Sequence, residues 1–330
     1  MDVLPSNSAS DLQPLNPLSQ DVLLQHGCPT TTHPDLLIRH GNYLISYNHT
    51  LRIPNWTIEY LTPESLVRDA SCDRSFIPDV QIDKRFQVTD ADYAEVHNEK
   101  HRFLERGHMA PICNHSTSVE LAEATNYYTN VVPQVGPGFN SNFFAEGSGY
   151  ERGKGFANYG HWTRLEIYVR QKVKHDCKAW VVSGCLFLPD PPKEEIKGKE
   201  GTRRFVTYEV IGSQNVAVPT HFFKAVLLMK AGRKVEQQEE PVTEEWFKIK
   251  NEEPEKREFD AAKYKTTAEE IEKILGYVIF PKICSTSAAG DAGKVQPTPE
   301  KADDNTSPSH DERNSQDTVA AAVKDLRLSD

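Results

Sequence analysis

The sequence predicts a folded domain that combines α-helices with a β-sheet, and three features carry this prediction. Short apolar runs rich in β-branched and aromatic residues, bounded by Gly and Pro, are typical of central sheet strands. The apolar spacing from Trp162 to Val173 indicates a helix. A second helix begins with the capping-box pair Thr267 and Glu270 and ends at Gly276.

The elements follow one another along the chain in a definite order. A hairpin is expected from 43 to 60, with its turn at 52–55, and the helix from 162 to about 175 comes next. Two charged segments, 189–204 and 232–258, are expected to connect later elements. The remaining apolar runs are expected to be strands, at 179–184, 205–212, 221–229 and 277–280.

Composition suggests three regions. With 38% hydrophobic and 26% charged residues, the 330-residue chain has the material for one or two folded domains. Residues 1–39 are rich in Ser, Pro, Asn and Leu without a period, and residues 285–330 turn to Ser, Asp, Pro, Ala and Lys. We therefore expect a disordered N-terminal arm at 1–39, a folded domain at 40–284 and a disordered acidic tail at 285–330.

The net charge of −10 argues at first against a partner as acidic as nucleic acid. Much of this acidity, however, lies in the Glu-rich stretch from 236 to 260 and in the tail. The rest of the chain is closer to neutral, so its overall charge does not exclude a nucleic-acid-binding domain.

Signals for location and for structural metal are weak. The first basic residue after Met1 is Arg39, so the sequence before it lacks the pattern of a secretory or transit peptide. No apolar run approaches the roughly 20 residues of a membrane span. The six cysteines are scattered without a Cys-x-x-Cys pair, so reduced thiols are expected and structural zinc is not. These features indicate an intracellular protein.

Two segments carry groups suited to cutting a phosphodiester bond. That reaction needs a base to activate water, positive charge near the transition state and usually a metal. The run Glu-Arg-Gly-His-Met-Ala-Pro supplies Arg106 and His108, although an Arg-Gly-His triplet alone is usually a turn. On a helix, Asn158 and Glu166 point within about 80° of one another and can reach one magnesium ion. The alternative is an N-cap Asn with a solvated Glu.

Together the motifs resemble a known family. The run 105–111, then Thr-Asn-Val-Val-Pro-Gln at 129–134, then Asn-x-Gly-x-Trp-x-x-x-Glu at 158–166 resemble the DNA/RNA non-specific endonucleases, in particular the endonuclease G branch. The similarity covers about residues 40–283. It implies an α+β fold with a central antiparallel sheet flanked by helices and a ββα-metal (His-Me finger) active site. It further implies Mg²⁺, with Mn²⁺ as an alternative, and cleavage of DNA and RNA that leaves 5′-phosphate ends.

The resemblance assigns catalytic roles by motif position. His108 is similar to the family's general base and Arg106 to an arginine that contacts phosphate. Asn130 resembles a supporting active-site asparagine. Arg74, in the run Arg-Ser-Phe-Ile-Pro-Asp, resembles a second arginine that stabilises the transition state.

The resemblance also suggests the metal ligands. Asn158 resembles the residue that binds magnesium directly, and Glu166 the residue that holds metal-bound water. Asn140 is an alternative ligand, since it sits at nearly the family's usual distance after Pro-Gln. Asn158 is preferred because its spacing to Trp162 and Glu166 is that of the family helix.

Two departures from the family pattern leave other functions open. Glu105 stands where the family usually has Asp, and 135–157 contains an insertion rich in Gly, Asn and Phe. The alternative function is therefore a weakened or inactive paralogue that binds nucleic acid or regulates. A third is a metalloprotein unrelated to nucleic acid.

The resemblance also bears on oligomeric state and location, and two further histidines are assigned from the sequence. The resemblance implies a homodimer in mitochondria, while the region before Arg39 leaves the cytoplasm or nucleus open. His221 lies in an apolar run and is expected to be a core histidine. His161 points away from Glu166 on the expected helix and is interpreted as a surface residue.

Overall fold

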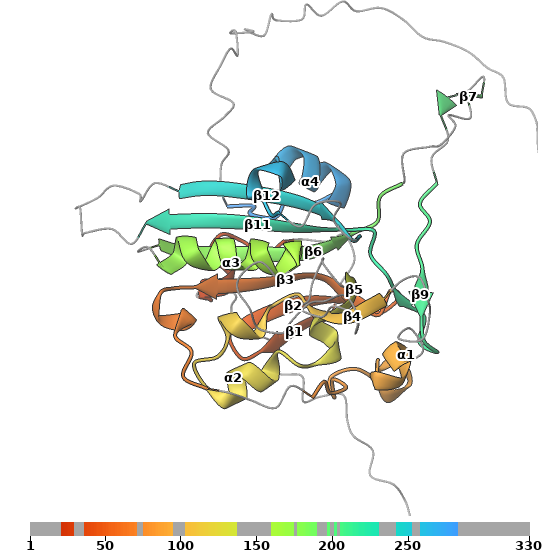
Figure 1. The fold of residues 1–330 in the computed structure, drawn as a ribbon, viewed down its shortest axis with the longest axis horizontal. Helices are drawn as coiled ribbons and strands as arrows, with labels where there is room; N and C mark the ends of the chain where they lie inside the picture. Colours follow the sequence, from red (N-terminus) through yellow and green to blue (C-terminus); the bar gives the residue numbers. More distant parts are fainter. Residues whose placement is uncertain are drawn as a thin grey trace, which may run out of the picture. The chain divides into compact units, whose positions relative to one another are not determined.

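A computed structural model gives the fold of the chain, drawn as a ribbon in Figure 1. The residues that it describes are 21–29, 36–70, 75–94, 103–136, 160–174, 177–189, 197–198, 201–202, 205–230, 242–252 and 258–282. Three candidate site residues, Arg74, Asn140 and Asn158, lie outside the described residues, as does the whole segment expected as a tail.

A seven-stranded sheet lies at the centre of the described part of the chain (Figure 1). Every pair of neighbouring strands in it runs antiparallel, which confirms the expected central antiparallel sheet. In spatial order its strands are β1 (Leu36–His40), β2 (Tyr43–Asn48), β3 (Ile53–Leu61), β6 (Cys177–Leu186), β11 (His221–Lys230), β12 (Val242–Lys250) and β13 (Lys265–Thr266).

The two long central strands, β6 and β11, are buried on both faces of the sheet. Because successive side chains of a strand point to opposite faces, the sheet separates two hydrophobic cores. Phe222 of β11 packs in one core with Leu165 of α3 (His161–Lys174). Its neighbour Phe223 packs in the other with Ile271 of α4 (Ala268–Leu275). The helices α3 and α4 therefore cover opposite faces.

Both helices form where the sequence predicts them. In α4 the Thr267 hydroxyl accepts a hydrogen bond from the N–H of Glu270. Gly276 ends this helix with a φ of 77°, a left-handed conformation that glycine adopts without steric cost. The predicted N-cap at Thr267 and the predicted stop at Gly276 are therefore confirmed, while the Glu270 carboxylate contacts Lys248 and Thr266.

Shorter elements surround the sheet. Two small strand pairs form outside the seven-stranded sheet. They are β4 (Phe103–His108) with β5 (Val131–Gly136), and β9 (Val210–Ile211) with β10 (Val216–Ala217). A third pair joins β7 (Lys197–Gly198) to β8 (Gly201–Thr202). The short helices are α1 (Asp90–Ala94) and α2 (Val119–Ala124), and the 3₁₀ turns are Val22–Leu24, Glu64–Leu66, Lys84–Phe86, Ile112–Asn114, Tyr128–Asn130 and Ala261–Tyr264.

Several predicted strands are wrong. The run 205–212 forms only the two-residue strand β9, and 277–280 is not a strand, although Ile279 and Phe280 still enter the core beside α4. The Glu-rich segment expected as a connection contains β12, which buries Phe247 and Ile249 in the core on the α3 face of the sheet and Trp246 in the core on the α4 face. The hairpin expected at 43–60 is formed by β2 and β3, and its turn is at 49–52 and not at 52–55.

The folded domain also begins before residue 40, so the expected boundary is wrong. Leu23 and Leu24 are buried against the core on the α4 face. The indole N–H of Trp180 donates to the carbonyl of Val22 at 2.7 Å, and His26 packs edge-on against the same indole. Residues 36–39 belong to β1. Part of the segment expected as an arm is therefore held on the domain.

Four of the cysteines fall within the described part of the chain. Cys28, Cys113, Cys177 and Cys185 are free thiols. Among the described residues, no helix combines the length and the apolar character needed to cross a membrane.

Candidate active site

Two short antiparallel strands bring the first two motifs side by side. In β4 and β5, His108 lies opposite Val131, Arg106 opposite Pro133 and Glu105 opposite Gln134. Leu104, Val131, Val132 and Val135 anchor the pair in the core that also receives α3. Because Arg106 and His108 are two residues apart on a strand, their side chains lie on the same face.

Gly107 allows the two strands to pack closely. A Cβ at this position would lie 2.1 Å from the Cδ of Gln134. The Gln134 side chain is fully buried, so it has little room to move away. The φ of Gly107 is not positive, so the glycine is needed here for space and not for an unusual backbone angle.

Replacing Gly107 with alanine is therefore expected to lower the free energy of unfolding by about 1–3 kcal/mol, the usual cost of overpacking a core. The displaced strand also carries His108, so any activity that depends on His108 should fall at the same time. The combination with Gln134→Ala should recover part of both losses, because it removes the colliding atoms. Urea unfolding and a cleavage assay of the single and double variants measure this, and a double variant no better than Gly107→Ala would contradict it.

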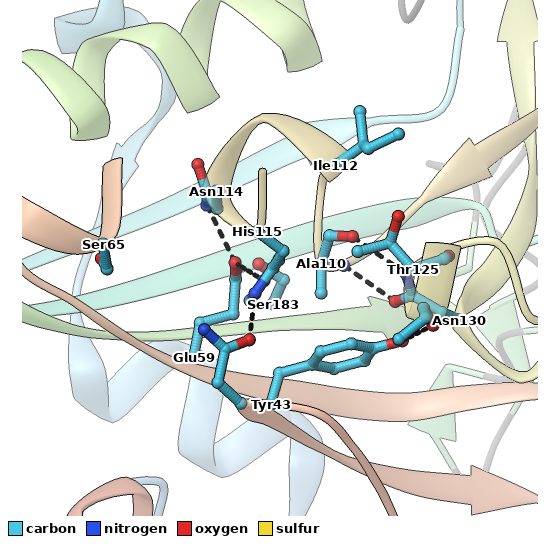
Figure 2. A network of polar contacts seen from close by, with 12 residues as sticks. Tyr43, Glu59, Ser65, Ala110, Ile112, Asn114, His115, Thr125, Asn130 and Ser183 are labelled. Atoms are coloured by element: carbon cyan, nitrogen blue, oxygen red, sulfur yellow. Dashed lines mark hydrogen bonds and ion pairs between the residues drawn. The ribbon is translucent and has the colours of Figure 1, made fainter. Parts of the chain in front are cut away.

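Asn130 fixes the chain directly after His108 (Figure 2). Its carboxamide oxygen accepts from the N–H of Ala110 at 2.9 Å, and its amide nitrogen donates to the carbonyls of Ala110 and Thr125, both at 2.9 Å. The backbone carbonyl of Asn130 accepts from Met109. Asn130 is fully buried, so its contacts hold the turn after His108 in place.

The His108 ring is half-buried between two side chains that the sequence does not identify. Its Nε2 lies 3.1 Å from the Oδ1 of Asn126, and its ring centroid lies 5.1 Å from that of Phe76. With the carboxamide oxygen of Asn126 as acceptor, the proton of the neutral ring is on Nε2 and the lone pair is on Nδ1. This is the protonation state of a general base.

Arg106 lies against the same aromatic ring, that of Phe76. Its guanidinium carbon is 5.1 Å from the Phe76 centroid, and its side chain is 34% exposed. Arg106 forms an ion pair with Asp90, which also accepts a hydrogen bond from the Tyr128 hydroxyl. One cation and one imidazole thus share Phe76 as a common support.

The segment that carries Phe76 is tied to the segment that carries Asn126. Ile77 donates its N–H to the carbonyl of Asn126 at 3.1 Å, and Tyr128 donates to the carbonyl of Ile77 at 3.0 Å. Phe76 is two residues after Arg74 in the chain. The run in which Arg74 was identified therefore lies beside His108, although Arg74 itself is not described.

Glu166 is buried on α3 in a separate cluster of charges. Burial raises the pKa of Glu166 to about 7, while Lys224 and Arg170 act in the opposite direction. Lys224, on β11, is also buried; it contacts the Ser183 hydroxyl and lies 4.5 Å from the Trp162 ring centroid. The carboxylate therefore faces a fixed internal cation.

A polar network connects this cluster to the turn after His108. In Figure 2, the buried Glu59 of β3 accepts from Asn114 at 2.8 Å and contacts Nε2 of His115 at 2.9 Å. Arg170 of α3 donates to the Oδ1 of Asn114 at 3.3 Å. Asn114 and His115 follow His108 closely in the chain, so these bonds tie α3 and the central sheet to the catalytic candidate.

The two other histidines give one correction. His161 is buried and not on the surface; its Nδ1 lies near the Tyr264 hydroxyl, and its ring packs against Phe259. Its burial comes from the aromatic rings of Phe259 and Tyr264, which pack on it at the start of α3. His221 lies on β11 and is half-buried beside the Thr220 hydroxyl.

Of the candidate metal-site residues, Glu166 is the one that the structure describes, and its carboxylate is a hard oxygen donor. Among the described residues, no group of three or more His, Cys, Asp and Glu side chains is arranged to hold a metal. Magnesium needs few direct protein ligands, because it keeps several waters. A carboxylate such as Glu166, whose charged form is disfavoured by burial, would gain from a nearby divalent cation.

Comparison with protein families gives one match over most of the chain. The model of the family described as DNA/RNA non-specific endonuclease matches residues 19–285. This range contains all of the described residues discussed above, and its start agrees with the ordered segment that begins near residue 21.

Individual proteins show the same similarity. The mitochondrial nuclease EXOG of Xenopus laevis is 34% identical over 277 residues, which are 83% of this chain and 65% of the relative. The mitochondrial endonuclease G of Caenorhabditis elegans is 32% identical, over 69% of this chain and 63% of the relative. A crystal structure of an EndoG/EndoGI complex matches with a TM-score of 0.63 and 29% identity, over 79% of this chain and 91% of that chain. The chain thus spans slightly less than two thirds of the two relatives.

Proposed function

Since the chain belongs to the DNA/RNA non-specific endonuclease family, we propose that it is a metal-dependent endonuclease that hydrolyses DNA and RNA with little sequence preference. The observation that supports this most directly is the pairing of His108 with Arg106 on one face of β4, with the His108 ring oriented by Asn126. Relatives named as nucleases point to the same class of activity.

The proposed reaction starts with proton transfer to His108. Nδ1 takes a proton from a water molecule, whose oxygen attacks the phosphorus in line with the leaving 3′ oxygen. The new P–O bond forms as the P–O3′ bond breaks, and the 3′ oxygen takes up a proton from solvent. Arg106 stabilises the charge that develops on the phosphoryl oxygens, and Arg74 is proposed to add a second positive charge. The products carry a 5′ phosphate and a 3′ hydroxyl.

Asn130 is proposed to act through position and not through contact with the substrate. Its carboxamide is occupied by the backbone N–H and carbonyl of Ala110, two residues after His108, and by the carbonyl of Thr125. Asn126 and Phe76 join it as positioning residues, because they orient the His108 ring.

Magnesium is the proposed metal, with Asn158 as its direct ligand, Asn140 as the alternative, and Glu166 as the carboxylate that holds bound water. When bound, it would supply positive charge that neutralises the leaving 3′ oxygen. By analogy with the mitochondrial relatives, a mitochondrial location is proposed, and by family resemblance a homodimer.

Removal of divalent metal is expected to stop cleavage. The full chain should degrade supercoiled plasmid and a single-stranded RNA in Mg²⁺, lose this activity in EDTA and recover it when Mg²⁺ or Mn²⁺ is added back. Ligation of the products to an adaptor that requires a 5′ phosphate tests the end chemistry. If the protein binds both nucleic acids but cuts neither with any metal, it is instead a non-catalytic member of the family.

A further inference from the structure

A groove runs along one face of α3, on the side of the sheet that carries β4 and β5. Its volume is about 310 Å³. Helix residues form one wall and the segments around two short 3₁₀ turns form the other; the lining includes Thr163, Ile167, Arg170 and Lys174 from α3, with Arg68 and Cys113 opposite. At a rise of about 1.5 Å per residue, the helical wall from Thr163 to Lys174 is about 16 Å long.

The groove is positively charged in a protein whose net charge is −10. Arg68, Arg170 and Lys174 line it, and among the described lining residues there is no carboxylate. Asn114 holds Arg170 in place through a hydrogen bond of 3.3 Å. Arg68 contacts the thiol of Cys113, and both Arg68 and Lys174 are exposed. Three cations are thus spread along a hollow surface.

Both walls of the groove are close in sequence to residues of the candidate site. Cys113 belongs to the turn Ile112–Asn114, which closely follows His108 in the chain. Thr163 is in the first turn of α3, five residues after Asn158 in the sequence. Glu166 lies on the same helix, with its side chain turned inward. Both walls of the groove are therefore continuous in the chain with segments that carry candidate site residues.

We infer that this groove binds the phosphate backbone of the nucleic acid next to the scissile bond, with Arg68, Arg170 and Lys174 as its contacts. The inference rests on the proposed nuclease function, because that function supplies a polyanionic strand at His108. Spaced cations without an aromatic platform suit phosphates more than bases, so the groove should contribute affinity without sequence preference.

Salt dependence tests the inference. Binding of a duplex of about 20 base pairs is measured at several salt concentrations in EDTA, with a gel to check that the duplex is intact. Arg68→Gln and Lys174→Gln should each reduce the slope of log K against log salt by about 1, and the double variant by about 2. Arg170 is left unchanged because it also bonds to Asn114.

The matched control is Lys273→Gln. Lys273 is an exposed lysine on α4, which covers the opposite face of the sheet. This variant loses the same charge and should keep the slope of the parent. Equal slopes for the groove variants and the control would overturn the inference. A protein that shows the groove effect but never cuts nucleic acid would disprove the proposed function and leave the groove assignment intact.

Alkylation of Cys113 distinguishes binding of a nucleic-acid backbone in the groove from binding of a free phosphate ion. Saturating duplex should slow iodoacetamide labelling of Cys113 several-fold, as followed by peptide mass spectrometry. Cys28, which packs on the α4 face, is the internal reference. Inorganic phosphate at equal ionic strength should not protect Cys113. Equal protection by phosphate would show a free-anion site, and no protection by duplex would exclude backbone binding; either result overturns the inference.

Discussion

Replacing His108 with alanine is expected to slow cleavage of plasmid and RNA by about 10²–10⁴-fold, the usual contribution of a general base. The variant loses the Nδ1 lone pair that is proposed to take the proton from water. Its fold should persist, because the ring is only half-buried and the turn after it is held by the backbone and side chain of Asn130. Initial rates of plasmid relaxation, measured beside urea unfolding curves, separate the two effects.

A surface histidine gives the control for this experiment. His49→Ala changes an exposed histidine in the β2–β3 turn and should cut at the rate of the parent. Asn126→Ala should give a smaller loss than His108→Ala, because the ring remains but its tautomer is no longer fixed. If His108→Ala, folded like the parent, still cuts at the parental rate, His108 is not the base.

The fold was predictable where a strand or helix has a single clear pattern. β6 and β11 are apolar along nearly their whole length because they are covered on both faces. β12 was missed because acidic residues dominate the segment around it, although Trp246, Phe247 and Ile249 within the strand reach the cores. The run 205–212 has strand-like residues, yet only Val210 and Ile211 in it form a strand, since strand pairing depends on neighbours that the local sequence does not specify.

The site was predictable only in part. Motif order indicated His108, Arg106 and Asn130, and the structure joins these three in and around the β4–β5 pair. Asn126 and Phe76 could not be found from spacing, because their contacts with His108 exist only once the segments 75–79 and 126–128 meet.

Lys224 carries a signal of its burial that is visible in the sequence. It is a charged residue within the apolar run His-Phe-Phe-Lys-Ala-Val-Leu-Leu, and a lysine is rarely fully buried unless it is paired. Its partner was less obvious, since Glu166 lies far away in the chain and reaches Lys224 only because α3 packs on β11.

Replacing Lys224 with methionine is expected to lower the free energy of unfolding by about 3–5 kcal/mol at pH 8, the cost of leaving a buried charge without its partner. Glu166 would then lose the cation that favours its charged form. The comparison uses Lys248→Met, which breaks a partly exposed ion pair between β12 and Glu270 of α4 and should cost no more than about 1 kcal/mol.

The loss caused by Lys224→Met should depend on pH in a definite direction. Burial already raises the pKa of Glu166 to about 7, and removal of Lys224 raises it further. A carboxyl group with a raised folded-state pKa favours the folded state at low pH and loses this advantage as pH rises. Urea unfolding in EDTA should therefore show a smaller loss at pH 5 than at pH 8. Glu166→Gln in the same background should remove part of the penalty at pH 8. A loss independent of pH, and not relieved by Glu166→Gln, would mean that Lys224 stabilises the domain by packing on Trp162 and not by charge.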